Sequence, residues 1–428
     1  MHWFITKNVR LKMLTLLKNP AQILTLNTGG VNFLKGRKME EIGLLTGHSI
    51  IIENDRIKEV VPDSKIGKKK FDAVINLEGK IVLPGLIDCH THTAFAGSRA
   101  NEFRLKLKGA TYEEIANSGG GINRTVQSVR SSGFDELVKI IRPRINYFIK
   151  QGVTTLEIKS GYGLSFYDEI KLLQVINYFK KESKIDIIPT FLGAHTFPPE
   201  YKNDQDKYLS VIIDEMLPFI AEKKLAEFCD AFCEKTAFSP EQTDRIFTAA
   251  SEKGLKLKLH SEQFNTIGGI DIGIKHKVSS IDHLEVVTDE NLEKLAATDI
   301  VSVLLPGVSF FLGYGFAPAR KIIDNGGIVA LSTDYNPGSS HIADLNLIMS
   351  LACLKMKMSV EETISAVTIN AAKALQVEKE TGSIEPGKTA DFAVFNTTDY
   401  SDIIYSVGMN LNCMTIKNGV IIYQSTEE

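Results

Sequence analysis

The sequence predicts a TIM-like (β/α)8 barrel with a small β-sandwich domain formed by both chain termini. From Pro84 onward, apolar strand candidates alternate with helix candidates, and eight such strands fall within about 250 residues. Eight strand–helix repeats over that length favour a closed barrel over an open sheet. The segments on either side of this region have β character instead. We therefore expect a composite β domain (residues 1–83 and 386–428) and a barrel domain (residues 84–385).

The first part of the chain contains short β-rich runs rather than a helical pattern. Gly-Gly, Asn-Asp and Glu-Gly pairs separate these runs and are typical of turns. The expected strands cover residues 22–26, 49–52, 57–61 and 73–75. Residues 414–423 return to β character and would form a last pair of strands, so the two ends of the chain are expected to pair with each other.

The barrel region alternates between strand and helix patterns. The expected helices cover residues 136–150, 166–181, 240–253, 290–296 and 317–325. The expected strands are the run before His90 and residues 153–158, 186–191, 228–232, 255–259, 279–282, 301–305 and 328–331. A capping box, Ser359-Val-Glu-Glu362, then opens a helix whose apolar face would run from Val360 to Leu375 and include Ile364, Val367 and Ala371.

Composition excludes several classes of function. The 428 residues are 43% hydrophobic and 24% charged, and the formal net charge is −3, so nothing indicates a nucleic acid or a membrane as partner. Five cysteines without dense spacing indicate a reducing, cytoplasmic location without a disulfide framework. No apolar run approaches the roughly 18 residues of a spanning helix, and the start lacks the features of a signal peptide. Met13 is an equally good candidate for the start of the chain, which leaves the role of the residues before it open.

A histidine pair lies at the centre of the pattern. The stretch Pro84-Gly-Leu-Ile-Asp-Cys-His-Thr-His92 follows an apolar run that reads as a buried strand. Side chains at i and i+2 of a strand point to the same face, so His90 and His92 would lie side by side. Imidazole is the commonest metal ligand near neutral pH. Alone, the pair would be better explained as two unrelated polar residues at a strand end.

Further histidines and an aspartate recur at the ends of other predicted strands. Catalytic groups of a closed barrel of this kind lie at the C-terminal ends of its strands. His195, His260, His283 and Asp334 each occupy such an end. With the His90 pair included, five separate strands end in a residue of a type that binds metal ions. This recurrence predicts a single polar site at one mouth of the barrel.

These residues resemble the amidohydrolase superfamily of metal-dependent barrels, and the flanking β domain is similar too. Within it, several segments resemble the imidazolonepropionase family over nearly the whole chain after Met13. These segments are Ala96-Gly-Ser-Arg99, Gly109-Ala-Thr-Tyr112, Gly119-Gly-Gly-Ile122, Lys159-Ser-Gly-Tyr-Gly-Leu164, Gly193-Ala-His195 and Asp334-Tyr-Asn-Pro-Gly-Ser339. The resemblance implies hydrolysis of the ring amide of 4-imidazolone-5-propanoate to N-formimidoyl-L-glutamate in histidine degradation. It also implies a homodimer.

The resemblance implies one divalent metal per chain. Its ligands would be His90, His92, His260 and Asp334. A divalent ion lowers the pKa of bound water from about 15.7 to around 7 and polarises a carbonyl, which a poorly electrophilic cyclic amide requires. Three imidazoles and one carboxylate suit Zn and Fe equally. Asp334 would accept the water proton and pass it to the leaving nitrogen, and His283 would orient the nucleophile or stabilise developing charge. The alternative for His283 is a satisfied core histidine.

The substrate of that family carries a propionate tail, and a guanidinium binds such a carboxylate bidentately. Arg99, in the loop after the histidine pair, is placed for this, although a surface arginine is the alternative. Tyr162 and His195 would hydrogen-bond the ring or the tail. The turn after Asp334 would bind the product's carboxylate through amides and a hydroxyl of Asn336, Gly338 and Ser339.

Gln263 departs from the pattern of related barrel deaminases, which place a glutamate three residues after this histidine. Some imidazolonepropionases also carry glutamate there. A glutamine cannot shuttle a proton but can hydrogen-bond a ring amide. We therefore expect Gln263 to assist catalysis by binding the lactam, with Asp334 and His283 moving protons. This residue and Arg99 disfavour a deaminase.

Strand parity predicts a polar barrel interior. With His260 facing inward, Lys258 shares its face, and on an earlier strand Glu157 and Lys159 share another. Buried lysines need partners, so we expect Glu157 to pair with a lysine inside the barrel, Lys258 being the first candidate. A second metal bridged by carboxylated Lys159 is an alternative. Cys229 and Cys233, about 13 Å apart on a strand, are expected in the core.

Two other functions remain open from sequence. One is another cyclic-amide hydrolase or an aromatic-base deaminase on the same barrel. The other is a non-catalytic scaffold, which would be expected to have lost metal ligands, whereas this chain keeps them all. Metal content separates the scaffold from the enzymes, and an activity screen separates the enzymes from each other.

Overall fold

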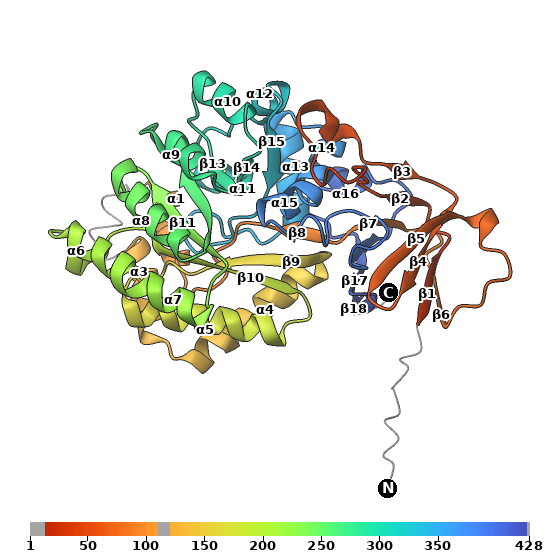
Figure 1. Ribbon diagram of the computed structural model, residues 1–428, viewed down its shortest axis with the longest axis horizontal. Coiled ribbons are helices and arrows are strands. Elements are labelled where there is room, and N and C mark those ends of the chain that lie inside the picture. The colour runs from red at the N-terminus through yellow and green to blue at the C-terminus, as the bar shows by residue number, and fades with distance from the viewer. Residues whose placement is uncertain (1–12, 110–119, 426–428) are drawn as a thin grey trace, which may run out of the picture.

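The computed structural model describes residues 13–109 and 120–425, and a parallel barrel of eight strands occupies most of it (Figure 1). The strands follow one another in chain order around the sheet, as the alternating pattern predicts. They are β8 (Leu86–Asp88), β9 (Val153–Lys159), β10 (Asp186–Ala194), β11 (Phe228–Cys233), β12 (Lys256–Ser261), β13 (Ser280–His283), β14 (Val301–Leu304) and β15 (Ile328–Leu331). The predicted barrel is confirmed, and each predicted strand lies within three residues of an observed one.

The first and last barrel strands close the barrel through their ends. In the described part of the chain no ladder pairs β8 with β15. The backbone N–H of Asp334 instead donates to the carbonyl of His90 at 3.1 Å. The carboxylate of Asp88 accepts hydrogen bonds from the hydroxyls of Ser332 and Thr333. We call this junction the β8–β15 seam.

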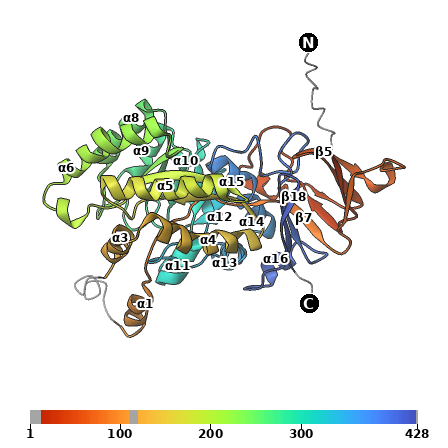
Figure 2. The same cartoon turned by 90° about the horizontal axis from the view of Figure 1, so that it is seen from below.

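Helices cover the outside of the barrel (Figure 2). The five helices expected between residues 136 and 325 are confirmed within two residues at each end, and the other helices of this region were not predicted. The helices from β8 to β15 are α1 (Ala100–Leu107), α3 (Ile122–Ser131), α4 (Phe134–Lys150), α5 (Phe166–Glu182), α6 (Gln205–Ser210), α7 (Leu217–Lys223), α8 (Pro240–Glu252), α9 (Gly269–His276), α10 (Asp289–Ala296), α11 (Pro306–Leu312) and α12 (Ala319–Asp324). After β15 follows α13 (Leu345–Met356).

One predicted helix is broken in two. The capping box at Ser359 is present, but α14 (Val360–Ala366) ends before α15 (Ile369–Ala374) begins. Between them the carbonyl of Val367 leaves the helical pattern and accepts a hydrogen bond from the N–H of Ile87 in β8 at 2.9 Å. The prediction of one continuous helix was wrong because a contact with a remote strand replaces a helical hydrogen bond.

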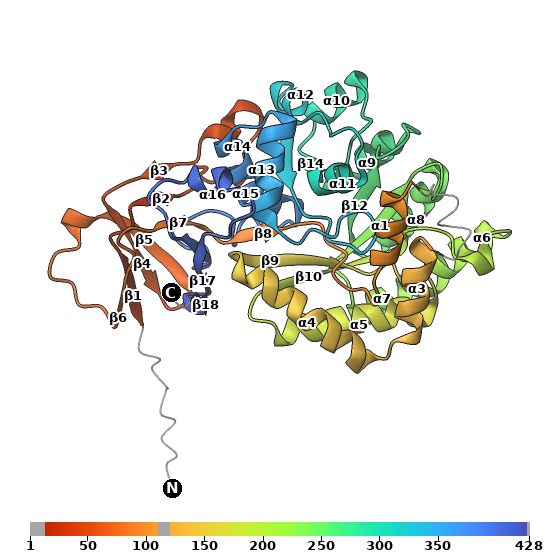
Figure 3. The ribbon, with the colours of Figure 1, turned by 180° about the vertical axis from the view of Figure 1, so that it is seen from behind.

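Two smaller sheets lie beside the barrel, and strands from the N-terminal and C-terminal segments pair in the six-stranded one (Figures 1 and 3). A four-stranded sheet has the order β5-β4-β1-β6, and a six-stranded sheet has the order β18-β17-β16-β7-β2-β3. Their strands are β1 (Leu14–Lys18), β2 (Gln22–Leu24), β3 (Leu44–Leu45), β4 (His48–Glu53), β5 (Arg56–Pro62), β6 (Ala73–Asn76), β7 (Ile81–Pro84), β16 (Phe392–Phe395), β17 (Asn412–Lys417) and β18 (Val420–Gln424). Because β7 of the six-stranded sheet is followed at once by β8, the chain passes directly into the barrel. The domain bounds at residues 83/84 and 385/386 stay a prediction.

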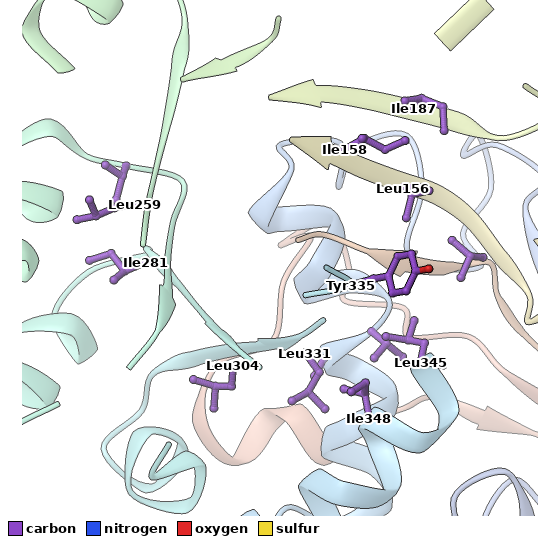
Figure 4. Close-up of a cluster of buried hydrophobic side chains, with 14 of the residues drawn as sticks. Leu156, Ile158, Ile187, Leu259, Ile281, Leu304, Leu331, Tyr335, Leu345 and Ile348 are labelled. Atoms are coloured by element: carbon purple, nitrogen blue, oxygen red, sulfur yellow. The ribbon is translucent and has the colours of Figure 1, made fainter. Parts of the chain in front are cut away.

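Aliphatic side chains lie outside the barrel wall. Leu156 and Ile158 of β9 are fully buried in the main core cluster, which also contains Leu345 and Ile348 of α13 (Figure 4). Glu157, between the first two, points to the other face. On β9 the charged side chains therefore face the interior and the aliphatic ones face the helices, as the parity of this strand predicts. On the next two strands, Ile188 is in register with Glu157 and Phe228 lies two residues before Asp230, and both belong to a second buried apolar cluster.

Several remaining expectations concern single residues or segments. Cys229 and Cys233 are buried free thiols in the core, as predicted. Residues 1–12 and 110–119 lie outside the described residues, and with them the first residues of the chain and parts of two family-like segments. Within the described ranges, no helix has the length and apolar character needed to cross a membrane.

Candidate metal centre

Four predicted ligands converge at the C-terminal ends of the barrel strands. Asp334 Oδ1 lies 3.4 Å from Nε2 of His90 and 3.3 Å from Nε2 of His92. His260 Nε2 lies 3.5 Å from His92 Nε2. All four side chains are buried. The loop after β8, the end of β12 and the loop after β15 thus bring side chains from distant parts of the chain to one point.

The spacing of these atoms suits a divalent ion. Ligand atoms about 2.1 Å from a tetrahedral ion lie about 3.4 Å from one another. The separations between His90 and Asp334, between His92 and Asp334 and between His92 and His260 are 3.4, 3.3 and 3.5 Å. His90 Nε2 and Asp334 Oδ1 are buried without a hydrogen-bond partner within the described residues. Buried polar atoms without partners are costly, and a coordinated ion satisfies both. The donor set therefore fits the proposed metal.

Two aspartates that the sequence analysis did not select hold the outer ring nitrogens. Asp282 Oδ2 lies 2.5 Å from Nδ1 of His90, and Asp230 Oδ1 lies 3.0 Å from Nδ1 of His260. A carboxylate at Nδ1 keeps the proton there and leaves Nε2 free to bind an ion. Strand parity was the available signal, because Asp230 is paired in register with inward-facing Lys258.

A buried ionic layer lies beneath this site. Lys159 Nζ lies 2.8 Å from both Glu157 Oε2 and Asp230 Oδ2, and Lys258 Nζ lies 3.1 Å from Glu157 Oε1. The predicted pair of Glu157 and Lys258 is confirmed. Both lysines also lie 3.9 Å from Asp282. Three carboxylates thus share two ammonium groups, and each of these five side chains is fully buried.

The ionic layer determines the charge of its members. Burial lowers the pKa of Lys159, but the charges of Asp230 and Glu157 outweigh burial and raise it above its ordinary value. Burial raises the pKa of Asp230, but His260 and Lys159 outweigh it and hold the pKa well below the usual range. An ammonium held by two carboxylates disfavours the carboxylated lysine that a second, bridged metal would need.

A cavity of about 1100 Å³ opens above the ligands. Arg99, predicted to bind a carboxylate, lines it and donates from Nε to Glu102 Oε2 at 2.8 Å. Its guanidinium also lies against the backbone of Gly338, where a Cβ atom would collide with Nη1. Arg99 is therefore a cavity residue held in place on both sides, not a surface arginine.

The two predicted ring-binding residues lie on one wall of the cavity. The His195 ring stacks on His92 at 5.2 Å between centroids, and Tyr162 lies 5.4 Å from His195. His195 Nδ1 lies 2.9 Å from the carbonyl of Gly161, so Nδ1 carries the proton and Nε2 is left as an acceptor. Burial lowers the pKa of His195 to about 3, and the ring is neutral at physiological pH.

The turn after Asp334 is closed by its own side chains. Asn336 Oδ1 accepts hydrogen bonds from the amides of Gly338 and Ser339 at 2.8 and 2.7 Å. Its Nδ2 donates to Asp334 Oδ2 at 3.0 Å. The amides predicted to bind a product carboxylate are thus engaged within the loop. In this structure Asn336 positions the carboxylate of Asp334.

Gln263 and three residues outside the predicted set complete the cavity. Gln263 Nε2 donates to Tyr314 Oη at 3.0 Å, which fixes the amide at the wall. His341, for which sequence offered no functional context, lines the cavity, and so does Arg144 of α4. The Arg144 guanidinium donates to the carbonyls of residues 93 and 95, which supports the loop after β8. These residues could not be selected from sequence because none follows a barrel strand directly.

His283 lies beside the ligands, as predicted. One of its ring nitrogens lies within 4.8 Å of ring nitrogens of His90 and His260. The side chain is buried and lines the cavity, with its ring centroid 5.4 Å from that of His260. This position disfavours the alternative of a core histidine without function.

Comparison with known proteins gives consistent results. The model of the amidohydrolase family matches residues 81–422. An imidazolonepropionase from Geobacillus thermodenitrificans is 43% identical, with coverage of 95% of this chain and 97% of that protein. Another from Christiangramia forsetii is 41% identical, with coverage of 96% and 100%.

Solved structures share the fold at low identity. The structure of atrazine chlorohydrolase from Arthrobacter aurescens TC1 complexed with zinc has a TM-score of 0.73 at 17% identity and covers 96% of this chain and 95% of its own. An adenosine deaminase from Xanthomonas campestris with bound zinc has a TM-score of 0.68 at 16% identity, with coverage of 96% and 93%. These likenesses concern the fold alone.

Proposed function

The chain belongs to the amidohydrolase family and, within it, to the imidazolonepropionases, and from this membership we propose how its cavity performs the reaction. The chain is a hydrolase of the C–N bond of a cyclic amide. It converts 4-imidazolone-5-propanoate to N-formimidoyl-L-glutamate in histidine degradation. The observation that carries the site proposal is the convergence of His90, His92, His260 and Asp334 at the floor of a cavity that also contains Arg99.

We propose that these four residues hold one divalent ion, either Zn or Fe. When bound there, such an ion would lower the pKa of water and polarise the ring carbonyl. Asp334 accepts a proton from the water whose oxygen attacks the carbonyl carbon, and returns a proton to the ring nitrogen as the C–N bond breaks. Asn336 holds the Asp334 carboxylate in place through the hydrogen bond at Oδ2. His283 orients the water from the side of the cavity.

The substrate is proposed to bind between Arg99 and the histidine wall. The guanidinium receives the propionate, while Tyr162 and His195 face the ring and Gln263 reaches its amide. A deaminase with a glutamate acid is disfavoured because Gln263 cannot transfer a proton. The scaffold alternative is disfavoured because the proposed ligands are all present and converge. A homodimer and a cytoplasmic location remain proposals.

The substitution Arg99→Met is expected to raise KM about 10- to 150-fold with little change in kcat, because a hydrogen-bonded charge pair contributes about 1.5–3 kcal/mol. Steady-state kinetics would measure this. Arg104→Met, at an exposed position of α1, the helix that begins directly after Arg99, is the matched control and should leave both constants unchanged. A fall in kcat at unchanged KM would contradict carboxylate binding by Arg99.

The function is tested by a coupled assay. Imidazolone propionate is generated from urocanate by urocanase, and formiminoglutamate is followed after addition of the metal-loaded protein. Formation of formiminoglutamate is expected, with one ion per chain by emission spectroscopy. If metal is bound and no product forms, the substrate assignment is wrong, and a panel of other cyclic amides would be screened. Absence of metal would instead favour the scaffold.

A further inference from the structure

A buried carboxylate lies behind the cavity wall just after β13. The Glu285 side chain is 3% exposed, and its Oε1 lies 3.4 Å from Nδ1 of His283. Its other oxygen, Oε2, is buried without a hydrogen-bond partner within the described ranges. Among the residues that the structure describes, His283 is its sole ion-pair partner. The carboxylates of the ionic layer, by contrast, face lysines.

The backbone at this position is strained. His283 and Leu284 have φ values of 91° and 69°, a conformation that side-chain-bearing residues seldom adopt and that consecutive residues rarely share. Two backbone hydrogen bonds hold the turn, from Leu284 N to Ser261 O at 3.3 Å and from Val286 N to Glu262 O at 2.9 Å. Strain of this kind persists where the surrounding structure enforces it, and it concentrates at functional sites.

The turn gives the two nitrogens of His283 different surroundings. Nδ1 lies 3.4 Å from Oε1 of Glu285. The ring lines the cavity between Phe232 and His260, with centroids 6.4 and 5.4 Å away. With Nδ1 engaged, Nε2 is the nitrogen left for the cavity. A histidine that acts on water must present this nitrogen in a defined protonation state, which its other nitrogen decides.

We propose that Glu285 is a positioning residue for the hydrolysis, which holds the proton of His283 on Nδ1 and so presents Nε2 to the reacting water. This inference rests on the proposed function. It explains why a carboxylate is buried with an imidazole as partner, and why the backbone is strained at His283 and Leu284. Gln263 cannot transfer a proton in this cavity. His283, with its imidazole held by the Glu285 carboxylate, is a group that can act there.

A double-mutant cycle tests the proposal. Glu285→Leu is expected to lower kcat about 10- to 100-fold with little change in KM, because partners that orient a functional histidine have effects of that size. In a His283→Ala background the same substitution should cause no further loss. Equal losses in both backgrounds would overturn the proposal, because a merely structural role is independent of the imidazole. Glu285→Gln, which keeps an acceptor oxygen, should recover part of the rate.

Glu262→Gln is the matched control. Glu262 is also a buried carboxylate at a strand end and also has one oxygen without a partner, but its other oxygen accepts from Thr266 rather than from a histidine. This variant should keep the wild-type kcat. If Glu262→Gln loses as much rate as Glu285→Leu, the loss reflects a general disturbance of this end of the barrel.

The tautomer of His283 is a readout that does not need turnover. In protein labelled with ¹⁵N-histidine, solid-state NMR distinguishes the two neutral tautomers, and His283→Gln assigns the signal. Wild type should show the proton on Nδ1, and Glu285→Leu should show a mixture. A proton on Nε2 in wild type would overturn the proposal. If wild type fails to hydrolyse imidazolone propionate, the proposed function fails, and the NMR result still decides the role of Glu285.

Discussion

Asp334→Ala is expected to remove turnover by at least about 10⁴-fold and most of the bound metal with it. General acid–base catalysis alone contributes about 10²–10⁴-fold, and loss of the one anionic ligand weakens the metal site in addition. The carboxylate faces His90 Nε2 and His92 Nε2 at 3.4 and 3.3 Å, so no other described side chain can replace it there. The coupled assay and emission spectroscopy after dialysis against a chelator measure the two losses.

Two further variants separate these effects. Asp334→Asn keeps the shape and loses the charge, and it should retain more metal than alanine while remaining inactive, because an amide cannot accept the water proton. Asp299→Asn, at an exposed position paired with Lys35 on the surface, should behave as wild type. Metal retention and more than a tenth of the wild-type rate in Asp334→Ala would refute both roles.

Lys159→Met is expected to lower the free energy of unfolding by about 3–5 kcal/mol, the usual cost of removing one partner from a buried ion pair. It leaves three buried carboxylates with a single ammonium, that of Lys258. Asp230, freed from Lys159, would also hold His260 less firmly, so metal affinity should fall about 10- to 100-fold. Urea unfolding with a chelator present measures the first effect, and metal titration the second.

Lys256→Met is the control for the loss of a lysine from the barrel. Lys256 begins β12 and is half-buried, and its Nζ lies 5.1 Å from the centre of the Phe228 ring. A cation–π contact of this kind contributes about 0.5–1 kcal/mol. If both variants lose the same stability, the ionic layer is not what holds the barrel interior together.

The barrel could be predicted because each strand is marked locally. Apolar residues recur within short segments, either as a run, as in Ile328–Leu331, or alternating with polar residues, as in Lys256–Ser261, and helical periodicity fills the gaps. The break between α14 and α15 could not be predicted, because it depends on the contact of Val367 with Ile87 in a strand far away in sequence. The helix propensities of residues 359–375 do not indicate that contact.

The proposed ligands could likewise be predicted, since histidines and an aspartate at strand ends are conspicuous. Asp230, Asp282 and Glu285 were not selected. Strand parity could place an aspartate on the inward face, but the histidine that it meets depends on the register of the neighbouring strands. In the turn after Asp334, by contrast, residues were selected whose hydrogen bonds turn out to be used within the protein. Asn336 and its neighbours were expected to meet a ligand, yet the asparagine uses its hydrogen bonds on the turn itself, which residue types do not reveal.

The β8–β15 seam also determines when the site can form during synthesis. Asp88 and Ser332, which meet at the seam, are 244 residues apart. At 5–20 residues per second, a ribosome needs about 12 to 50 s to translate that interval. Throughout this time the nascent chain carries the histidines after β8 without the aspartate after β15. With the proposed ligand set, metal capture is therefore a late event, and an incomplete polypeptide has no finished site with which to compete for the cell's metal.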